Sequence, residues 1–252
     1  VGFGIAHIHT QRLREKLLRH NAAVTGHRLL RGGVGVGSAQ WATEPDLALV
    51  AEVAAEVAEI VALTLDHSVV LDRFTGTAVL PAELARNLGT LGYVARASGL
   101  TVDARADHPQ VDLGPGFTPV TQEGGDVLAR YAVRASEFAA SAALLPLLTE
   151  LAAVGGEGPV GAMGLGGERT AYGMPEGEGS GPAAGLGVVE AWRGTLCHRV
   201  ELGPDGRLTR VKIVDPSFFN WPALPVALAD TIVPDFPLAN KSFNQSYAGN
   251  DL

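Results

Sequence analysis

The sequence predicts a mainly α-helical fold that carries a small antiparallel β element. Three long stretches place apolar side chains at helical spacing, over residues 3–29, 45–66 and 126–153. A further stretch, over residues 188–214, alternates apolar and polar side chains around a glycine-rich turn. The long helices are therefore expected to form a bundle, with the β element and the loops covering one end.

The first two helices have clear boundary signals. The glycines of residues 31–33 are expected to end the first helix, and the glycine-rich stretch that follows lacks the spacing of a nucleotide-binding loop, so it predicts a turn. Thr43 is a suitable N-cap for the second helix. On that helix Glu52, Glu56 and Glu59 share one face with no cation between them, which indicates a solvated or partner-facing stripe.

The segments before the third helix are more irregular. Residues 67–80 are rich in β-branched side chains, which favour an extended conformation, and Pro81 is expected to start a short helix. Residues 89–120 are polar and interrupted by glycine and proline. They predict a long loop, and loops of this length inside a domain are commonly functional.

The third helix carries a ladder of charges. Asp126, Arg130 and Arg134 follow at spacings of four, and Glu137 comes three residues later. Side chains at these spacings share a helix face. We interpret the ladder as structural, tying the helix to a neighbouring element or to a partner subunit.

The C-terminal part begins with an irregular covering loop over residues 154–187. A β-hairpin is expected next, with strands over residues 188–202 and 207–214 around a Gly-Pro-Asp-Gly turn. A short helix over residues 223–228 follows, and the tail is expected to be a loop.

Composition excludes several classes of protein. The chain has 252 residues and a net charge of −8, and it shows no basic patch, so nucleic acid is not an expected partner. Only 18% of the residues are charged, below the globular average of about 25%. This favours burial against other proteins, with biased composition as the alternative.

The single cysteine, Cys197, forms no internal disulfide and is expected in a packed strand. No run of about 18 apolar residues exists, so no membrane span is predicted. The start at Val1 suggests that the chain begins inside a longer reading frame.

Several short motifs follow one another along the chain. They are Thr25-Gly26-His27-Arg28 with Gly32-Gly33, Arg96-Ala97-Ser98-Gly99 with residues 103–109, Gly125-Asp126 with Arg130, Arg134 and Glu137, Glu190 with Arg193-Gly194, and Pro216-Ser217-Phe218 with Asn220. In this order they resemble motifs of the hydrogenase-like large subunits, although Trp192 stands where that family has proline. The family includes group 4 nickel–iron hydrogenases of the formate hydrogenlyase type and the D-type subunit of NADH–quinone oxidoreductase. The resemblance covers nearly the whole chain.

The resemblance implies a single hydrogenase-large-subunit-like domain over residues 1–252, as the C-terminal part of a longer protein. In the hydrogenases the tail ends in Asp-Pro-Cys-x-x-Cys, and here the two cysteine positions fall on Ser246 and Gly249. Thiolates hold soft, redox-active metals, and neither a hydroxyl nor a hydrogen replaces them. We therefore expect no metal ligand in this chain. The D-type subunit of the quinone enzyme has also lost these cysteines.

A charged loop supplies the first candidate site, which we predict to be catalytic. Its members are Arg96, Asp103, Arg105, Asp107 and His108. Such groups can line a cavity where a proton or a quinone oxygen is handled, because guanidinium groups stabilise negative charge and a His–Asp pair relays protons. The alternative is a buried ion-pair network that fixes the loop to the helices.

A second candidate group surrounds the altered metal site and could line a cofactor cavity. Its members are Glu190, Arg193, Asn244, Ser246, Tyr247 and Asp251. The tail residues among them could hydrogen-bond a quinone or a water chain, or they could satisfy one another in a cavity that has lost its metal. For the glutamate and the arginine, a salt bridge at a strand end is the alternative.

The resemblance implies an electron-transfer subunit of a membrane-associated NADH–quinone oxidoreductase or hydrogenase-like complex, of the quinone type and without a nickel–iron centre. The alternatives are a catalytically decayed scaffold subunit and a true nickel–iron hydrogenase subunit with altered ligands. The implied partners are a small B-type subunit that carries an iron–sulfur cluster, a C-type partner, and ion-translocating membrane subunits. The implied location is the cytoplasmic face of the membrane, and activity of this chain alone is not expected.

Overall fold

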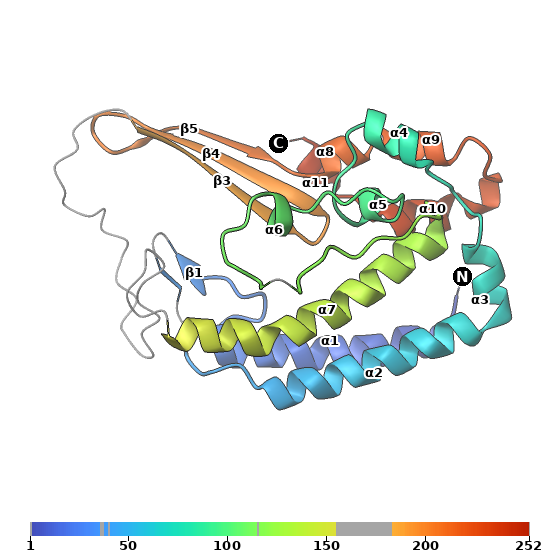
Figure 1. Ribbon diagram of the computed structural model, residues 1–252, viewed down its shortest axis with the longest axis horizontal. Helices are drawn as coiled ribbons and strands as arrows, with labels where there is room; N and C mark the ends of the chain where they lie inside the picture. The colour runs from blue at the N-terminus through green and yellow to red at the C-terminus, as the bar shows by residue number, and fades with distance from the viewer. Residues whose placement is uncertain (1, 36–37, 40, 115, 155–182, 252) are drawn as a thin grey trace. The chain divides into compact units, whose positions relative to one another are not determined.

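The computed structural model describes residues 2–35, 38–39, 41–114, 116–154 and 183–251 (Figure 1). The chain divides into two compact units. A helical unit contains residues 2–66 and the second half of the longest helix, α7 (Val127–Val154). A mixed unit contains residues 67–137 and the described residues from 183 onward. The predicted fold class, mainly α with a small antiparallel β element, is confirmed.

The helical unit is built on two long antiparallel helices, α1 (Gly4–Thr25) and α2 (Leu47–Asp66). Gly26 follows α1 in the left-handed conformation, with φ of 77°, and its N–H closes the last turn. The helix therefore ends before the predicted residue 29, because glycine has no Cβ and adopts the left-handed cap conformation without strain. Two antiparallel strands of two residues each, β1 (Val34–Gly35) and β2 (Ser38–Ala39), pair in the stretch where a turn was predicted.

The glutamate stripe of α2 is not free of cations. Lys16 on α1 lies 2.7 Å from Glu52 and 2.6 Å from Glu56, and Arg12 also pairs with Glu56. Glu52 and Glu59 are exposed, as a solvated stripe predicts, whereas Glu56 is half-buried against its cations. The sequence pattern did not reveal this pairing because the cations lie on another helix, about forty residues earlier in the sequence.

The mixed unit contains many short helices around one core. In chain order they are α3 (Ser68–Phe74), α4 (Ala82–Asn87), α5 (Gly92–Arg96), α6 (Ala104–Asp107), the first half of α7, α8 (Ser217–Asn220), α9 (Ala223–Ala227), a 3₁₀ turn η1 (Val233–Asp235), α10 (Phe236–Phe243) and α11 (Tyr247–Asn250). Fully buried Tyr93, Val133 and Phe243, from α5, α7 and α10, form part of this core. Segments far apart in the sequence therefore meet here.

Several predictions of local structure were wrong in this unit. Residues 68–74 are helical rather than extended, because Val70 and Phe74 lie one turn apart and are both buried, so packing overrides β-propensity. The tail contains α10 and α11 rather than a loop. The loop predicted over residues 89–120 contains the short helices α5 and α6.

The β element is a three-stranded antiparallel sheet of β3 (Ala183–Ala191), β4 (Gly194–Leu202) and β5 (Leu208–Val214). The sequence predicted one strand over residues 188–202, but the chain turns at Trp192 and Arg193, and Ala191 pairs with Gly194. The predicted Gly-Pro-Asp-Gly turn does join the next two strands. In Figure 1 the end of the sheet that carries the β3–β4 turn lies beside α5 and α6.

By length and composition, α7 is apolar enough over Val127–Ala152 to cross a membrane. The sequence shows no uninterrupted apolar run there because Arg130, Arg134 and Glu137 interrupt the first half of this helix. The core helix of a soluble protein passes the same test when it is mostly buried, but none of the apolar window of α7 is buried, and a single helix of this kind carries little weight. The hydropathy of α7 alone therefore does not assign it to a membrane.

Candidate functional site

Arg96, the last residue of α5, lies at the centre of a cluster of buried charges in the mixed unit. Its side chain is only 1% exposed. Its Nη1 donates to the carbonyl of Val102 at 2.8 Å and to Glu190 Oε1 at 2.9 Å. Its Nε lies 2.6 Å from Glu137 Oε1 as an ion pair, although that contact lacks hydrogen-bond geometry. The guanidinium thus joins a loop, a strand and a helix.

Asp103 is the second fully buried charge of this cluster. It caps α6, and its Oδ1 accepts the backbone N–H of Arg105. The Arg105 side chain donates to both carboxylate oxygens, from Nε at 2.9 Å and from Nη2 at 2.6 Å. Arg96 lies 3.3 Å away on the other side. A two-pronged contact of this kind fixes orientation as well as charge.

Glu190 brings the end of β3 into the cluster. Its Oε2 accepts the N–H of Ala104 at 3.0 Å and the Thr195 hydroxyl at 3.2 Å. We call Arg96, Asp103, Arg105, Glu137 and Glu190 the buried ion network. It contains two guanidinium groups and three carboxyl groups, so it carries one negative charge in excess when all are ionised.

The carboxyl groups of the network differ in acidity. Burial raises the pKa of Glu190 above its ordinary value, and the N–H of Ala104 and Arg96 offset this only in part. For Asp103 burial is again the largest effect, but the hydrogen bonds from Arg105 and the charge of Arg96 together hold its pKa below the usual range. The contact with Asp103 in turn raises the pKa of Arg105. The excess charge is therefore most readily neutralised by a proton on Glu190.

The predicted catalytic set divides in two. Arg96, Asp103 and Arg105 come together in the network, which matches the buried ion-pair alternative. Asp107 and His108 are exposed, and Asp107 Oδ2 accepts the backbone N–H of Asp103 at 3.0 Å. Within the described residues no hydrogen bond joins the His108 and Asp107 side chains, so the His–Asp pair expected from the sequence is not formed.

The β3–β4 turn is held against α5 by direct contact between backbones. A Cβ on Gly92 would lie 2.1 Å from the carbonyl oxygen of Arg193, so only glycine fits there. The Asn220 side chain accepts the N–H of Leu91 at 2.8 Å and donates to its carbonyl at 3.2 Å. This close approach places Glu190 within reach of Arg96.

Aromatic side chains reinforce the same contact. The rings of Tyr93 and Trp192 stack at 5.6 Å with an angle of 7° between them. The guanidinium of Arg193 lies 4.4 Å from the Trp192 ring centre, and that of Arg134 lies 5.1 Å from the Tyr93 ring centre. The tryptophan that replaces the proline of the family thus adds a stacking partner for the core tyrosine.

The tail residues form a second group beside this turn. Arg193 Nε donates to the carbonyl of Asn244 at 2.7 Å. The Ser246 side chain caps α11, and Trp221 Nε1 donates to the Ser246 carbonyl at 3.0 Å. Tyr247 is mostly exposed, with its ring 4.9 Å from the Trp221 ring. Of the predicted cofactor-cavity residues, Glu190 belongs to the buried network instead.

Asp251 is exposed, and its Oδ1 accepts a long contact of 3.5 Å from the Asn250 side chain. It follows α11 directly, on the same short stretch as Tyr247. Asp251, like Tyr247, is therefore accessible to solvent.

The tail does not fit a thiolate-held nickel–iron centre. At the two positions where the resemblance expects cysteine, Ser246 Oγ accepts the N–H of Gly249 at 3.0 Å, and a Cβ on Gly249 would lie 2.5 Å from Asp215 Cγ. Among the described residues no group of three histidine, cysteine or acidic side chains could hold a metal ion. The residues of the tail therefore supply neither the ligands nor the space that such a centre needs.

The charge ladder of α7 serves several separate partners. Asp126 accepts the N–H groups of Gly76 and Ala129, at 2.8 Å and 2.7 Å. Fully buried Arg130 donates to two backbone carbonyls and to the Ser242 hydroxyl, and burial lowers its pKa to about 9. These contacts tie α7 to neighbouring elements, as the structural interpretation of the ladder predicts. The placement of Glu137 beside Arg96 does not follow from the sequence.

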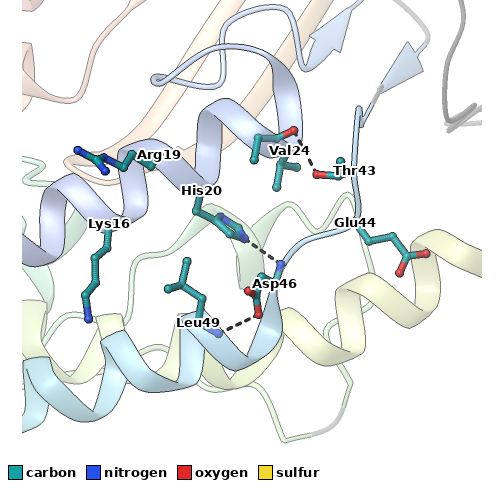
Figure 2. A pocket seen from close by; sticks show the side chains of 9 residues that line it. Lys16, Arg19, His20, Val24, Thr43, Glu44, Asp46 and Leu49 are labelled. Atoms are coloured by element: carbon teal, nitrogen blue, oxygen red, sulfur yellow. Dashed lines mark hydrogen bonds between the residues drawn. The ribbon is translucent and has the colours of Figure 1, made fainter.

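The helical unit contains an open cavity of about 360 Å³ between α1 and the segment that leads into α2 (Figure 2). Figure 2 shows the His20 ring directed at the backbone of Asp46, whose N–H it accepts at 2.9 Å. The two cations of its wall are already paired, Lys16 with the α2 glutamates and Arg19 with Glu15. These contacts hold the loop to the helix and provide no evident binding chemistry.

Three residues important to the site were not singled out from the sequence. Asp215 covers Gly249, Thr195 bonds Glu190, and Tyr93 stacks on Trp192. The only sequence signal was the position of Asp215 next to the Pro-Ser-Phe motif. The other two belong to ordinary apolar or alternating segments, where nothing marks a single residue.

Comparison with known proteins identifies relatives of this chain. Residues 1–159 match the family described as respiratory-chain NADH dehydrogenase, 49 kDa subunit. The chain is 29% identical to hydrogenase-4 component G of Escherichia coli, over all of this chain and 41% of that protein. It is 31% identical to formate hydrogenlyase subunit 5 of the same organism, over 78% of this chain and 32% of that protein. It is 28% identical to NADH-quinone oxidoreductase subunit 4 of Thermus thermophilus, over 89% of this chain and 59% of that protein. The chain thus spans less than two thirds of the length of each of these relatives.

A solved structure has the same fold. It is a chain of the membrane-bound sulfane sulfur reductase, an archaeal respiratory membrane complex. The two superpose with a TM-score of 0.77 over 96% of this chain and 65% of that chain, at 21% sequence identity. At this identity the likeness establishes the fold.

Proposed function

The chain belongs to the family of the 49 kDa subunit of respiratory-chain NADH dehydrogenase, and from this premise we propose that it is part of a D-type electron-transfer subunit in a membrane-associated oxidoreductase complex. The reaction is reduction of a quinone, without a nickel–iron centre in this subunit. The observation that carries the choice of the quinone type is the contact between Asp215 and Gly249, which leaves no room for a ligand side chain.

The buried ion network has a positioning role in this proposal. Its two guanidinium groups are committed to internal carboxylates, so Arg96 and Asp103 do not contact a substrate. They fix the loop that presents Asp107 and His108 to solvent, where a histidine can exchange a proton with a substrate oxygen. Glu190, whose pKa is raised, is the member of the network best suited to hold a proton.

The tail supplies a second surface in the same unit. Exposed Tyr247 and the neighbouring Trp221 ring offer an apolar stacking surface, and Asn244 and Asp251, three residues before and four residues after Tyr247 in the sequence, carry polar groups. An aromatic face next to hydrogen-bonding groups suits a planar quinone head group. We propose that a quinone approaches the mixed unit at this surface.

The proposal extends to partners and location. The relatives named above include components of hydrogenase and quinone oxidoreductase enzymes, and the superposed structure is part of a membrane complex. We infer a small B-type subunit with an iron–sulfur cluster as electron donor, a C-type neighbour, and ion-translocating membrane subunits. The complex would place this chain at the cytoplasmic face of the membrane.

A scaffold role is the second candidate. It is favoured by the internal pairing of the buried ion network, in which every charged group has an ion-pair partner within the chain. In that case the subunit keeps its fold and its interfaces while its site no longer turns over. The third possibility, a nickel–iron hydrogenase with altered ligands, requires stoichiometric nickel in the purified protein.

The test uses the full-length protein, co-expressed with its neighbouring subunits. Quinone reduction and hydrogen evolution are measured for the wild type and for Asp107→Asn and Arg105→Gln. Loss of quinone reduction with intact assembly supports the enzymatic function, whereas loss of assembly alone supports the scaffold. Asp72→Asn, an exposed aspartate on α3 of the same unit, is the matched control and should leave both readouts unchanged. A wild-type complex without redox turnover would rule the enzymatic proposal out.

A further inference from the structure

The turn that joins α10 to α11 is held by contacts from the segment at the start of α8. The backbone N–H of Ser246 donates to the Ser217 hydroxyl at 3.0 Å, and the Ser246 carbonyl accepts Trp221 Nε1 at 3.0 Å. The Ser246 hydroxyl accepts the N–H of Gly249, also at 3.0 Å. The backbone N–H, the carbonyl and the hydroxyl oxygen of Ser246 are thus engaged within the chain.

Gly249 is buried, and its environment leaves no room for a side chain. A Cβ built there would lie 2.5 Å from Asp215 Cγ and 2.7 Å and 2.8 Å from the two carboxylate oxygens. Real Cβ atoms essentially never approach another atom below 3.0 Å. The backbone of Gly249 is helical and has no positive φ, so the conformation itself does not call for glycine. Glycine also disfavours a helix by about 1 kcal/mol relative to alanine. The position of the Asp215 carboxylate therefore explains why residue 249 is glycine.

The Asp215 carboxylate is itself held in place. Its Oδ1 accepts the N–H of Ser217 at 2.8 Å, at the start of α8. Residues 215–217 thus provide one contact to each of the two positions where the resemblance expects cysteine. These contacts hold the start of α8 against α11 directly, with no metal between them.

We propose that Asp215 is a built-in substitute for the ligand side chain at position 249: its carboxylate fills the space of that side chain and holds α11 against α8 without a metal. The inference deepens the proposed function, since the assignment of positions 246 and 249 rests on the same family resemblance. It predicts that a side chain at 249 is tolerated only when Asp215 is made smaller.

A double-mutant cycle on the full chain tests this. Gly249→Ala is expected to raise the unfolding equilibrium constant about tenfold, because overpacking of this kind typically costs one to three kcal/mol. In the Asp215→Gly background, the same alanine substitution should have no cost or a small benefit. Asp215→Asn keeps the volume and removes the charge, so alanine at 249 should remain costly in that background. Urea unfolding, with hydrogen exchange of the Ser246 and residue 249 amides, provides the readouts.

Gly4→Ala is the matched control, because Gly4 is helical and a Cβ there meets nothing within 4 Å. It should leave stability unchanged or raise it. If Gly249→Ala behaves like Gly4→Ala, or if its cost persists in the Asp215→Gly background, the proposal is wrong. If Asp215→Asn relieves the cost as well as Asp215→Gly does, charge rather than volume decides and the space-filling role is wrong.

A metal measurement separates this inference from the proposed function. The full chain is incubated with Ni²⁺, dialysed and analysed for bound metal, as the wild type and as Asp215→Gly. Neither is expected to retain stoichiometric nickel, and stoichiometric nickel in the wild type would overturn the inference. If the substitutions at 215 and 249 have non-additive effects on unfolding but the complex does not reduce quinone, only the proposed function is wrong. If the complex reduces quinone but the two substitutions have additive effects, only this inference is wrong.

Discussion

Two ion networks in this protein use the same kinds of side chain in different surroundings. Between α1 and α2, Lys16 pairs with Glu52 and Glu56 at the surface. In the mixed unit, Arg105 pairs with Asp103. The two cationic side chains are almost equally exposed, at 29% and 28%, but their partners are not: Glu52 is 57% exposed and Asp103 is 0% exposed.

From this difference we infer that the burial of the carboxylate, rather than the number of contacts, decides how much an ion pair contributes to the free energy of unfolding. A surface carboxylate that loses its cation regains water, so little is lost. A buried carboxylate that loses its cation keeps its desolvation cost and has no compensation. Matched substitutions in the two networks therefore test whether the burial of the carboxylate has this effect.

The largest effect is expected for Arg96→Met in the buried network. Three carboxyl groups would lose their shared cation, so the free energy of unfolding should fall by about 3–5 kcal/mol at neutral pH. Urea unfolding measures this loss. In the same background, Glu137→Gln with Glu190→Gln should recover part of the stability, because fewer unpaired charges remain buried. A loss below about 1 kcal/mol for the single variant would place this network with the surface ion pairs.

A smaller loss is expected for Arg105→Ala. It removes both side-chain hydrogen bonds to Asp103 but leaves Arg96 at 3.3 Å. The free energy of unfolding should fall by about 2 kcal/mol, as is typical for a charge-assisted contact to a buried group. The measurement is again urea unfolding. In the Asp103→Ala background the same substitution should cost much less, and equal costs in both backgrounds would contradict the assigned pairing.

The carboxyl groups of the buried network are expected to change stability with pH in opposite senses. The pKa of Glu190 is raised, so its contribution is fully present below its unfolded value near 4.5 and is lost as pH rises through the folded value. The pKa of Asp103 is lowered, so its contribution is present above its unfolded value near 3.8 and is lost as pH falls through the folded value.

Unfolding of Glu190→Gln over a pH series tests the first of these. Relative to the wild type, the variant should lack the fall in stability that begins as pH rises above about 4.5. Asp107→Asn, an exposed carboxylate of the same loop, should keep the wild-type profile. Parallel profiles for Glu190→Gln and the wild type would contradict the raised pKa.

The smallest effect is expected for Lys16→Ala on the surface. Although Lys16 contacts two glutamates, we expect no resolvable change in unfolding at physiological salt, because its partners return to water. Urea unfolding at low and high salt measures this. A loss as large as that of Arg105→Ala would remove the distinction between the two networks.

The sequence indicated most of the candidate site but not its arrangement. The charged loop was found because Arg96, Asp103 and Arg105 follow a recognisable motif. Their assembly into one network depends on Glu190, more than eighty residues later, and on Glu137 from another helix. Such pairings are set by the docking of the β3–β4 turn on α5. No local pattern of charge can report them.

From the sequence alone we could predict the long helices, the turn chemistry between β4 and β5, the family, and the absence of sulfur at positions 246 and 249, because periodicity and residue type are local properties of the chain. Three other features could be seen only in the folded protein: residues 68–74 are helical, the strand breaks at Trp192, and Asp215 covers Gly249. Each of these depends on burial or on a contact between distant segments, where packing outweighs local preference.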